Sequence, residues 1–171
     1  MESVGYAFLD ASALVKFFIK EDGSEKLIEF LNHESSYYTS PFCFYETLSA
    51  FKRKRNREEI TQKQYEDASF ELVAWFEYLS KQSGIKDIDF MDSEVFFMVR
   101  DLVQKYQKYK LDFSDAFQIV CVKRGYASHL VNGSQTIHVT ADDLLWEVAK
   151  EEGIRSWNIL KEEIPMRDKI S

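Results

Sequence analysis

Residues 6–16 read YAFLDASALVK, and this stretch decides the fold because it joins an apolar strand to a helix through one carboxylate. The run from Tyr6 to Leu9 predicts a short buried strand, and Asp10 follows it directly. A helix is expected from about Ala11 to Lys20. In open α/β sheets, ligands bind outside the carboxyl ends of the strands. Asp10 is therefore the first candidate for a functional site.

Three more acidic residues occupy comparable positions. Glu46 lies early in a predicted helix, Asp115 lies in the first turn of a helix expected over residues 112–124, and Asp142 follows a strand expected over residues 136–140. Converging acids repel one another unless a cation neutralises them, and oxygen-only ligation suits Mg²⁺ or Mn²⁺. The sequence therefore favours a divalent-metal site and metal-dependent phosphate chemistry.

Each acid also has a structural alternative. Asp10 or Ser12 could simply cap the helix that follows, and Ser12 as the cap would leave Asp10 free. Glu46 could be a solvated residue on the outer face of its helix. Both alternatives stay open on these residues alone.

Asp115 and Asp142 each lie next to residues that could cap the start of a helix. Asp112 could satisfy the first-turn amides of its helix, leaving Asp115 at a buried boundary where a carboxylate needs a partner. Thr140 and Asp143 have the spacing of a capping box, which would give Asp143 a structural part and aim Asp142 elsewhere.

The composition indicates one globular domain. The chain has 171 residues, 45% of them hydrophobic, which is enough to bury a substantial core. A net charge of −7 argues against a protein that binds nucleic acid over its whole surface, but it allows a nuclease with a local basic patch. No apolar run approaches the roughly 20 residues of a membrane helix. We expect a cytoplasmic protein without a membrane partner, with Cys43 and Cys121 as buried free thiols.

Strands alternate with helices along the chain, which predicts a mostly parallel sheet covered on both faces. The other expected strands cover residues 36–40, 85–90, 136–140 and 154–159. Two long helices, one starting at Pro41 and one capped by Thr61, are expected to form an antiparallel hairpin. We predict one domain over residues 1–160 with this hairpin inserted at about 41–80, then a charged tail over 161–171.

Four segments resemble the motifs of PIN-domain ribonucleases, in the order and spacing of that family. FLDASALVK over residues 8–16 resembles the opening motif, and SPFCFYETLSA over 40–50 resembles the second. LDFSDAFQIV over 111–120 resembles the third, and VTADDL over 139–144 resembles the fourth. The match spans about residues 6–159. It implies a three-layer α/β/α sandwich around a mostly parallel central sheet.

The resemblance also implies parts for individual residues and a cofactor. The catalytic and metal-binding acids would be Asp10, Glu46, Asp115 and Asp142. Auxiliary residues would be Asp112, Ser12 and Thr140, of which the last two would hold the acids and water by hydrogen bonds. The cofactor would be Mg²⁺ or Mn²⁺.

A cationic run is the candidate RNA contact. Residues 52–57 read KRKRNR, which places five cations at the end of the helix that carries Glu46. Lys52, Arg53 and Arg55 could contact an RNA backbone, or the run could be a solvated helix end that complements the helix dipole. Lys16 could reach a phosphate from the first helix or be a surface lysine.

The predicted function is a divalent-metal endoribonuclease, because compact members of this kind resemble VapC toxins, which cleave RNA and are held inactive by an antitoxin. The partners expected are an RNA substrate, a small antitoxin and a second copy in a homodimer. The alternatives are a housekeeping RNA-processing nuclease and an inactive PIN-like binding module. One departure is the long segment from Tyr126 to Gln135, which could cover the site, alter substrate choice or mediate assembly.

Overall fold

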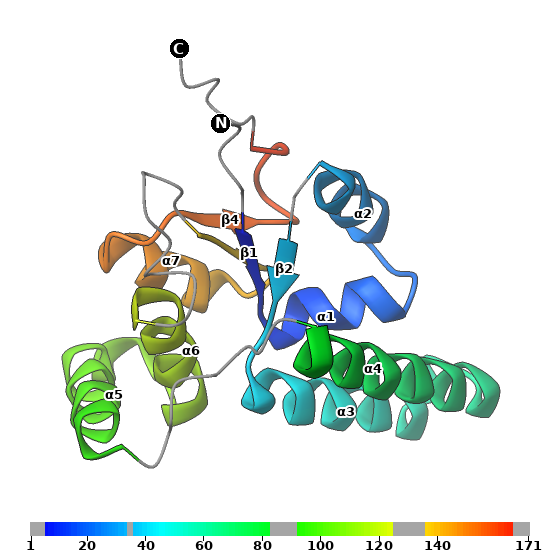
Figure 1. The fold of residues 1–171 in the computed structure, drawn as a ribbon, viewed down its shortest axis with the longest axis horizontal. Coiled ribbons are helices and arrows are strands. Elements are labelled where there is room, and N and C mark those ends of the chain that lie inside the picture. Colours follow the sequence, from blue (N-terminus) through cyan, green and yellow to red (C-terminus); the bar gives the residue numbers. More distant parts are fainter. Residues whose placement is uncertain (1–5, 34–35, 83–91, 125–135, 166–171) are drawn as a thin grey trace.

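A parallel sheet of four strands forms the centre of the protein, as the computed structural model shows for residues 6–33, 36–82, 92–124 and 136–165. The spatial order is β2-β1-β3-β4 (Figure 1). The strands are β1 (Tyr6–Leu9), β2 (Ser36–Tyr38), β3 (Ile137–Thr140) and β4 (Ser156–Asn158). The predicted parallel sheet is confirmed. The strand expected at 85–90 and the long segment 126–135 lie outside the described residues.

Helices connect these strands at nearly the positions that the sequence predicts. Between β1 and β3 they are α1 (Ala11–Phe18), α2 (Ser24–Asn32), α3 (Pro41–Asn56), α4 (Gln62–Gln82), α5 (Ser93–Lys105) and α6 (Phe113–Arg124). A short 3₁₀ helix, η1 (Gln107–Tyr109), follows α5, and α7 (Asp143–Glu151) joins β3 to β4. No helix in the described ranges is long and apolar enough to span a membrane.

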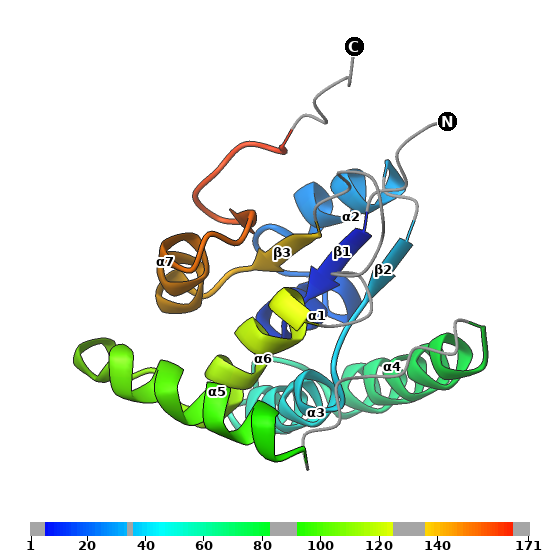
Figure 2. The same ribbon diagram turned by 60° about the vertical axis from the view of Figure 1, so that its left-hand side comes forward.

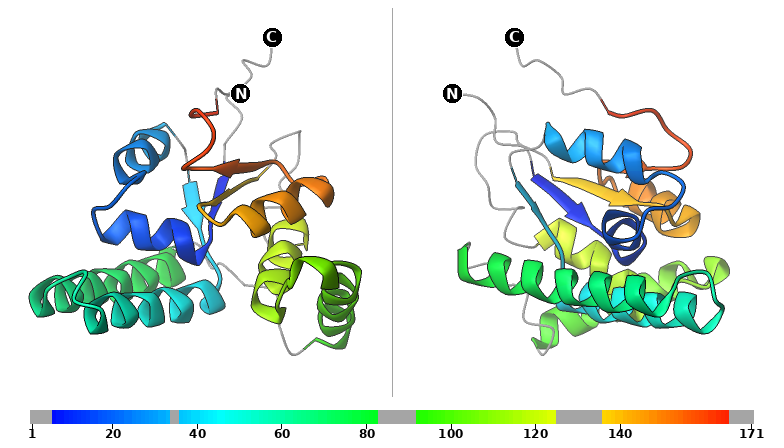
Figure 3. Two further views of the ribbon diagram at one scale, coloured as in Figure 1. Left: turned by 180° about the vertical axis from the view of Figure 1, so that it is seen from behind. Right: turned by 90° about the vertical axis from the view of Figure 1, so that its right-hand side faces the viewer.

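The helices cover both faces of the sheet. On one face, Phe17 of α1 packs its ring against Tyr37 of β2, and Phe30 of α2 packs against Trp157 of β4. Helix α6 lies on the opposite face (Figures 2 and 3). The three-layer α/β/α fold predicted from the sequence is therefore confirmed. Cys43 and Cys121 are buried in this core as thiols rather than as a disulfide, also as predicted.

Helices α3 and α4 form the predicted antiparallel hairpin (Figure 3). Thr61 and Gln64 exchange hydrogen bonds at the start of α4, since the Gln64 amide donates to Thr61 Oγ1 at 3.1 Å and the Thr61 amide donates to Gln64 Oε1 at 2.8 Å. Phe51 and Leu72 are fully buried between the two helices, in a second apolar cluster that also contains Val15 of α1. This cluster holds α3 alongside α1.

The start of the segment predicted as a charged tail contacts the domain. Glu162 accepts hydrogen bonds from Trp146 Nε1 of α7 at 3.0 Å and from the Asn158 amide at 2.9 Å. These bonds hold the chain after β4 against α7.

Candidate functional site

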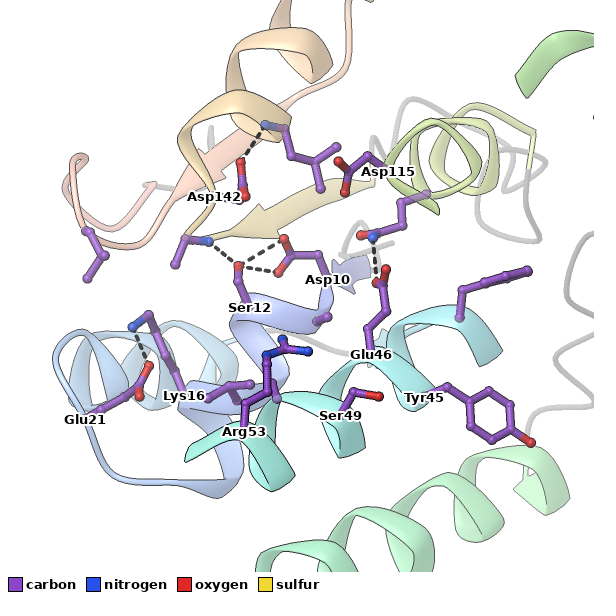
Figure 4. A pocket seen from close by; sticks show the side chains of 18 residues that line it. Asp10, Ser12, Lys16, Glu21, Tyr45, Glu46, Ser49, Arg53, Asp115 and Asp142 are labelled. Carbon is purple, nitrogen blue, oxygen red and sulfur yellow. Dashed lines mark hydrogen bonds and ion pairs between the residues drawn. The ribbon is translucent and has the colours of Figure 1, made fainter. Parts of the chain in front are cut away.

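A cavity of about 650 Å³ opens at the carboxyl ends of β1 and β3, between α1, α3, α6 and α7 (Figure 4). All the strands are parallel, so their carboxyl ends meet at one edge of the sheet. Asp10, Glu46, Asp115 and Asp142 all line this cavity. The structure thus brings together four acids that lie far apart in the sequence.

Asp10 lies deepest, with only 2% of its surface exposed. Its carboxylate caps α1 by accepting the Ala13 amide at 2.7 Å, and it also accepts the hydroxyls of Ser12 at 2.8 Å and Thr140 at 2.5 Å. Burial raises the pKa of Asp10 to about 6, although these three hydrogen bonds lower it. The interpretation of Ser12 as the cap is wrong, because Asp10 takes that position itself.

Ser12 instead links the first and last acidic motifs. Its hydroxyl donates to Asp10 and accepts the Ala141 amide at 2.7 Å, at the start of the loop between β3 and α7. Thr140 Oγ1 accepts the Asp142 amide at 2.8 Å while donating to Asp10. The two hydroxyls therefore orient Asp10 and fix the backbone beside Asp142.

The predicted capping box at residues 140–143 is wrong. Asp142 caps α7, since its Oδ1 accepts the Leu145 amide at 2.9 Å. Asp143 points away from its own helix start, accepting Asn158 Nδ2 at 2.9 Å and pairing with Lys161 at 2.7 Å. Asp142 also lines the cavity while it caps this helix.

Glu46 is half-buried and faces the cavity rather than the solvent side of α3. It accepts hydrogen bonds from two α6 side chains, from the Ser114 hydroxyl and from Gln118 Nε2 at 3.1 Å. Burial raises the pKa of Glu46, the Ser114 bond lowers it, and the nearby charge of Asp112 raises it again. The alternative of a solvated outer-face residue is wrong.

The pKa of Asp115 is raised further above its ordinary value than the pKa of Asp10. Burial raises the pKa of Asp115 to about 7, with further increases from the negative charges of Asp112, Asp142 and Glu46. Side chains from α3, α6 and the start of α7 thus act on a single carboxyl group. The predicted mutual repulsion of these acids follows from their positions.

Asp112 stands at the edge of this arrangement. It is exposed and accepts both the Asp115 amide at 2.9 Å and the Ser114 hydroxyl at 3.0 Å. The suggestion that it satisfies first-turn amides agrees with this geometry. Asp112 does not line the cavity, and it reaches Glu46 through the shared Ser114 hydroxyl.

Sequence reasoning missed Ser114 and Gln118. Gln118 is 2% exposed in an otherwise apolar buried run, and its Oε1 has no hydrogen-bond partner among the described residues. A lone amide in such a run is a usable signal, because buried polar groups require partners. Ser114 offered a weaker signal, its place between Asp112 and Asp115.

The predicted RNA-binding cations separate into two groups. Arg53 is exposed and lines the cavity, where its charge lowers the pKa of Glu46. Lys52 lies over the Tyr65 ring, 5.2 Å from its centroid, and Arg55 Nε donates to Gln62 at 3.0 Å, so both point toward α4. Neither lines the cavity.

Lys16 also lines the cavity but is 7% exposed, so the alternative of a surface lysine is wrong. Its ammonium pairs with Glu21 at 2.7 Å and donates to the Asp22 carbonyl at 2.8 Å. A buried ammonium needs such partners.

The four acids suit a hard divalent cation in their chemistry. All their donor atoms are oxygens, and the negative charge of Asp142 raises the pKa of both Asp10 and Asp115. Among the described residues, no three His, Cys, Asp or Glu side chains already surround one point at metal-binding distance. The residues that could hold Mg²⁺ or Mn²⁺ are Asp10, Glu46, Asp115 and Asp142.

Comparison with known proteins places the chain in a family. The family model described as the PIN domain matches residues 7–151, a range that contains all four acids of the cavity. No curated protein matches the chain. The PIN domain is generally a nuclease fold, and PIN nucleases generally use divalent metals. Because the matched residues make up well over half of the chain, the chain belongs to the PIN domain family.

Proposed function

We propose that this protein is an endoribonuclease that hydrolyses RNA phosphodiester bonds with Mg²⁺ or Mn²⁺. The observation that carries the proposal is the convergence of Asp10, Glu46, Asp115 and Asp142 on one cavity that Arg53 also lines. Metal-dependent hydrolysis of a phosphodiester uses acids that bind the cation and positive charge that holds the phosphate, and this cavity offers both. An inactive binding module would have no need for four acids held in mutual repulsion.

The residues of the chain have separate parts in the proposed reaction. The four acids hold the cation, which when bound neutralises phosphate charge and acts as a Lewis acid. Ser12 and Thr140 orient the Asp10 carboxylate, and Ser114 and Gln118 orient Glu46. Arg53 contacts a backbone phosphate of the substrate.

The test is a cleavage assay with purified protein and total cellular RNA. We expect cleavage in the presence of Mg²⁺ or Mn²⁺ and none when EDTA removes the cation. If no RNA in this mixture is cut with either cation, the inactive-module alternative is favoured. The same preparation of RNA incubated without protein controls for spontaneous hydrolysis.

Arg53→Ala is expected to weaken RNA binding, because Arg53 alone among Lys52, Arg53 and Arg55 lines the cavity. Binding of a labelled single-stranded RNA, measured by fluorescence anisotropy at several salt concentrations, should lose about 0.7 from the slope of log K against log salt. Arg55→Ala is the matched control, because it removes an arginine of the same helix that contacts Gln62 instead. Equal losses in the two variants would contradict the assignment.

We further propose that the nuclease is a cytoplasmic toxin, with a small antitoxin as its partner, and that it forms a homodimer. Support for a protein-contact surface comes from α4, where Phe70, Val73 and Tyr78 are all exposed on one side of the helix. Growth arrest on expression, relieved by a small protein encoded beside this one, separates the toxin from a housekeeping RNA-processing enzyme.

A further inference from the structure

Glu21 bridges two lysines at the end of the cavity away from the acids. It lies in the turn between α1 and α2, lines the cavity, and pairs with Lys16 of α1 at 2.7 Å and with Lys54 of α3 at 2.8 Å. About a quarter of each of the Glu21 and Lys54 side chains is exposed. Burial raises the pKa of Glu21, but the hydrogen bonds from both lysines hold it below its ordinary value. Glu21 is therefore an anion at neutral pH.

The turn that carries Glu21 is rigidly built. Ser24 Oγ accepts the Glu21 amide at 2.9 Å and donates to the Lys16 carbonyl at 2.7 Å, which joins the turn to the end of α1. Gly23 has a φ of 85°, and a Cβ atom there would come within 2.8 Å of Ile159. The position of the carboxylate between the two lysines is thus set by the fold.

Two of the helices around the cavity, α1 and α3, each change from acidic to basic along their length. On α1, Ser12 contacts Asp10, and Lys16 lies one turn farther on the same face, about 5.4 Å along the axis. On α3, Glu46 and Arg53 both line the cavity, two turns apart. A strand of RNA with one phosphate at the acids would therefore carry its next phosphates along the basic end (Figure 4).

We propose that Glu21 occupies, in the free protein, the place of an RNA backbone phosphate next to the scissile one, and that bound RNA exchanges its phosphate for this carboxylate at Lys16 and Lys54. This inference rests on the proposed function. Carboxylates and phosphates both accept charge-assisted hydrogen bonds from ammonium groups, so the exchange leaves the buried Lys16 charge paired. Glu21 is then an internal competitor that weakens RNA binding.

The test uses Glu21→Gln in an Asp10→Asn background, with a fluorescein-labelled single-stranded RNA of mixed sequence and Mg²⁺ present. A gel after each titration verifies that the RNA is intact. We expect anisotropy to show binding about three- to fivefold tighter than in the parent. The slope of log K against log salt should steepen by about 0.7, because a cation becomes available to a phosphate.

Glu25→Gln is the matched control. Glu25→Gln also removes one negative charge. Glu25 pairs with Lys20 at 2.9 Å, both side chains are more than four-fifths exposed, and neither lines the cavity. We expect this variant to leave affinity and salt slope nearly unchanged. If Glu21→Gln behaves like Glu25→Gln while the parent binds RNA, the exchange is wrong and the proposed nuclease stands. If the parent does not bind RNA at all, the proposed function fails together with this inference.

Lys54→Gln tests the same contact without disturbing a buried charge. Lys54 also pairs with Glu59 at 3.2 Å. We expect weaker RNA binding and a smaller effect of Glu21→Gln when the two substitutions are combined. A Lys54→Gln variant with unchanged affinity would overturn the exchange even if Glu21→Gln failed to fold.

Discussion

Asp10→Asn is expected to reduce RNA cleavage by roughly a thousandfold or more while leaving the fold intact. The substitution removes one of the four carboxylates proposed to bind the cation and so weakens cation binding. Asparagine is as good a helix cap as aspartate, so the hydrogen bond from the Ala13 amide is retained. Cleavage rates are measured in Mg²⁺ and Mn²⁺, and circular dichroism verifies the fold.

Asp143→Asn is the control for this change. Asp143 is the neighbour of a cavity acid, but its partners are Asn158 and Lys161 on the outer side of the domain. The variant should therefore cut RNA at nearly the parent rate. Undiminished cleavage by Asp10→Asn would remove Asp10 from the catalytic site, and equal losses in both variants would point to a general effect of charge.

The same Asp10→Asn substitution should stabilise the metal-free protein at neutral pH. The pKa of Asp10 is about 6 in the folded protein because of burial, against 3.8 for the ordinary group. Between these values the folded protein keeps a proton that the unfolded chain has released, so Asp10 lowers the stability of the fold as pH rises through this window. A shift of about two pH units corresponds to about 3 kcal/mol.

Urea unfolding in EDTA at pH 4 and at pH 7.5 measures this effect. The free energy of unfolding of Asp10→Asn, relative to the parent, should increase by about 2 kcal/mol between the two conditions. Asp115, whose pKa burial raises to about 7, and His138, whose pKa burial lowers to about 3 in the folded protein, also make stability depend on pH, but both are present in the two proteins and cancel. A difference that does not change with pH would contradict the raised pKa of Asp10.

A divalent cation should reverse this order of stability. Mg²⁺ or Mn²⁺ binds the folded parent through its four acids and raises its melting temperature with increasing concentration. Asp10→Asn, which lacks one of these ligands, should gain less. If both proteins respond equally to the cation, the acids are not its binding site.

The sequence predicts the architecture well because the pattern that encodes it is local. Short apolar runs alternate with amphipathic helices, and this alternation alone requires parallel strands with helices on both faces. Parallel strands place their carboxyl ends together, so Asp10 and Asp142 had to lie at one edge of the sheet. These inferences need no knowledge of side-chain contacts.

Ser12 and Thr140 are not the caps that the sequence also allows, because the helix start depends on the backbone at the end of the preceding strand, whereas the alternative of Asp10 as a cap is confirmed. Ser12 and Thr140 have good capping side chains, yet Asp10 and Asp142 are the residues with extended backbone immediately before each helix. A sequence pattern with an error of one or two residues in the helix start cannot choose between them. The acids thus combine the capping role with a place in the cavity.

The sequence also did not predict which side chains meet across different segments of the chain. Glu46 is held by Ser114 and Gln118, which lie 68 and 72 residues away. Lys16 is buried, and Glu21 in the turn after α1 supplies its counter-charge. Neither arrangement follows from periodicity, because each depends on how the loops place whole helices against one another.

The hydrogen bond from Thr140 to Asp10 joins residues 130 positions apart. During synthesis, a ribosome-bound chain that has not yet released β3 lacks this partner and also lacks Asp142. Its acidic cavity is therefore incomplete until β3 and Asp142 have emerged. For the proposed nuclease, this order of synthesis would spare the message while these residues are still being made.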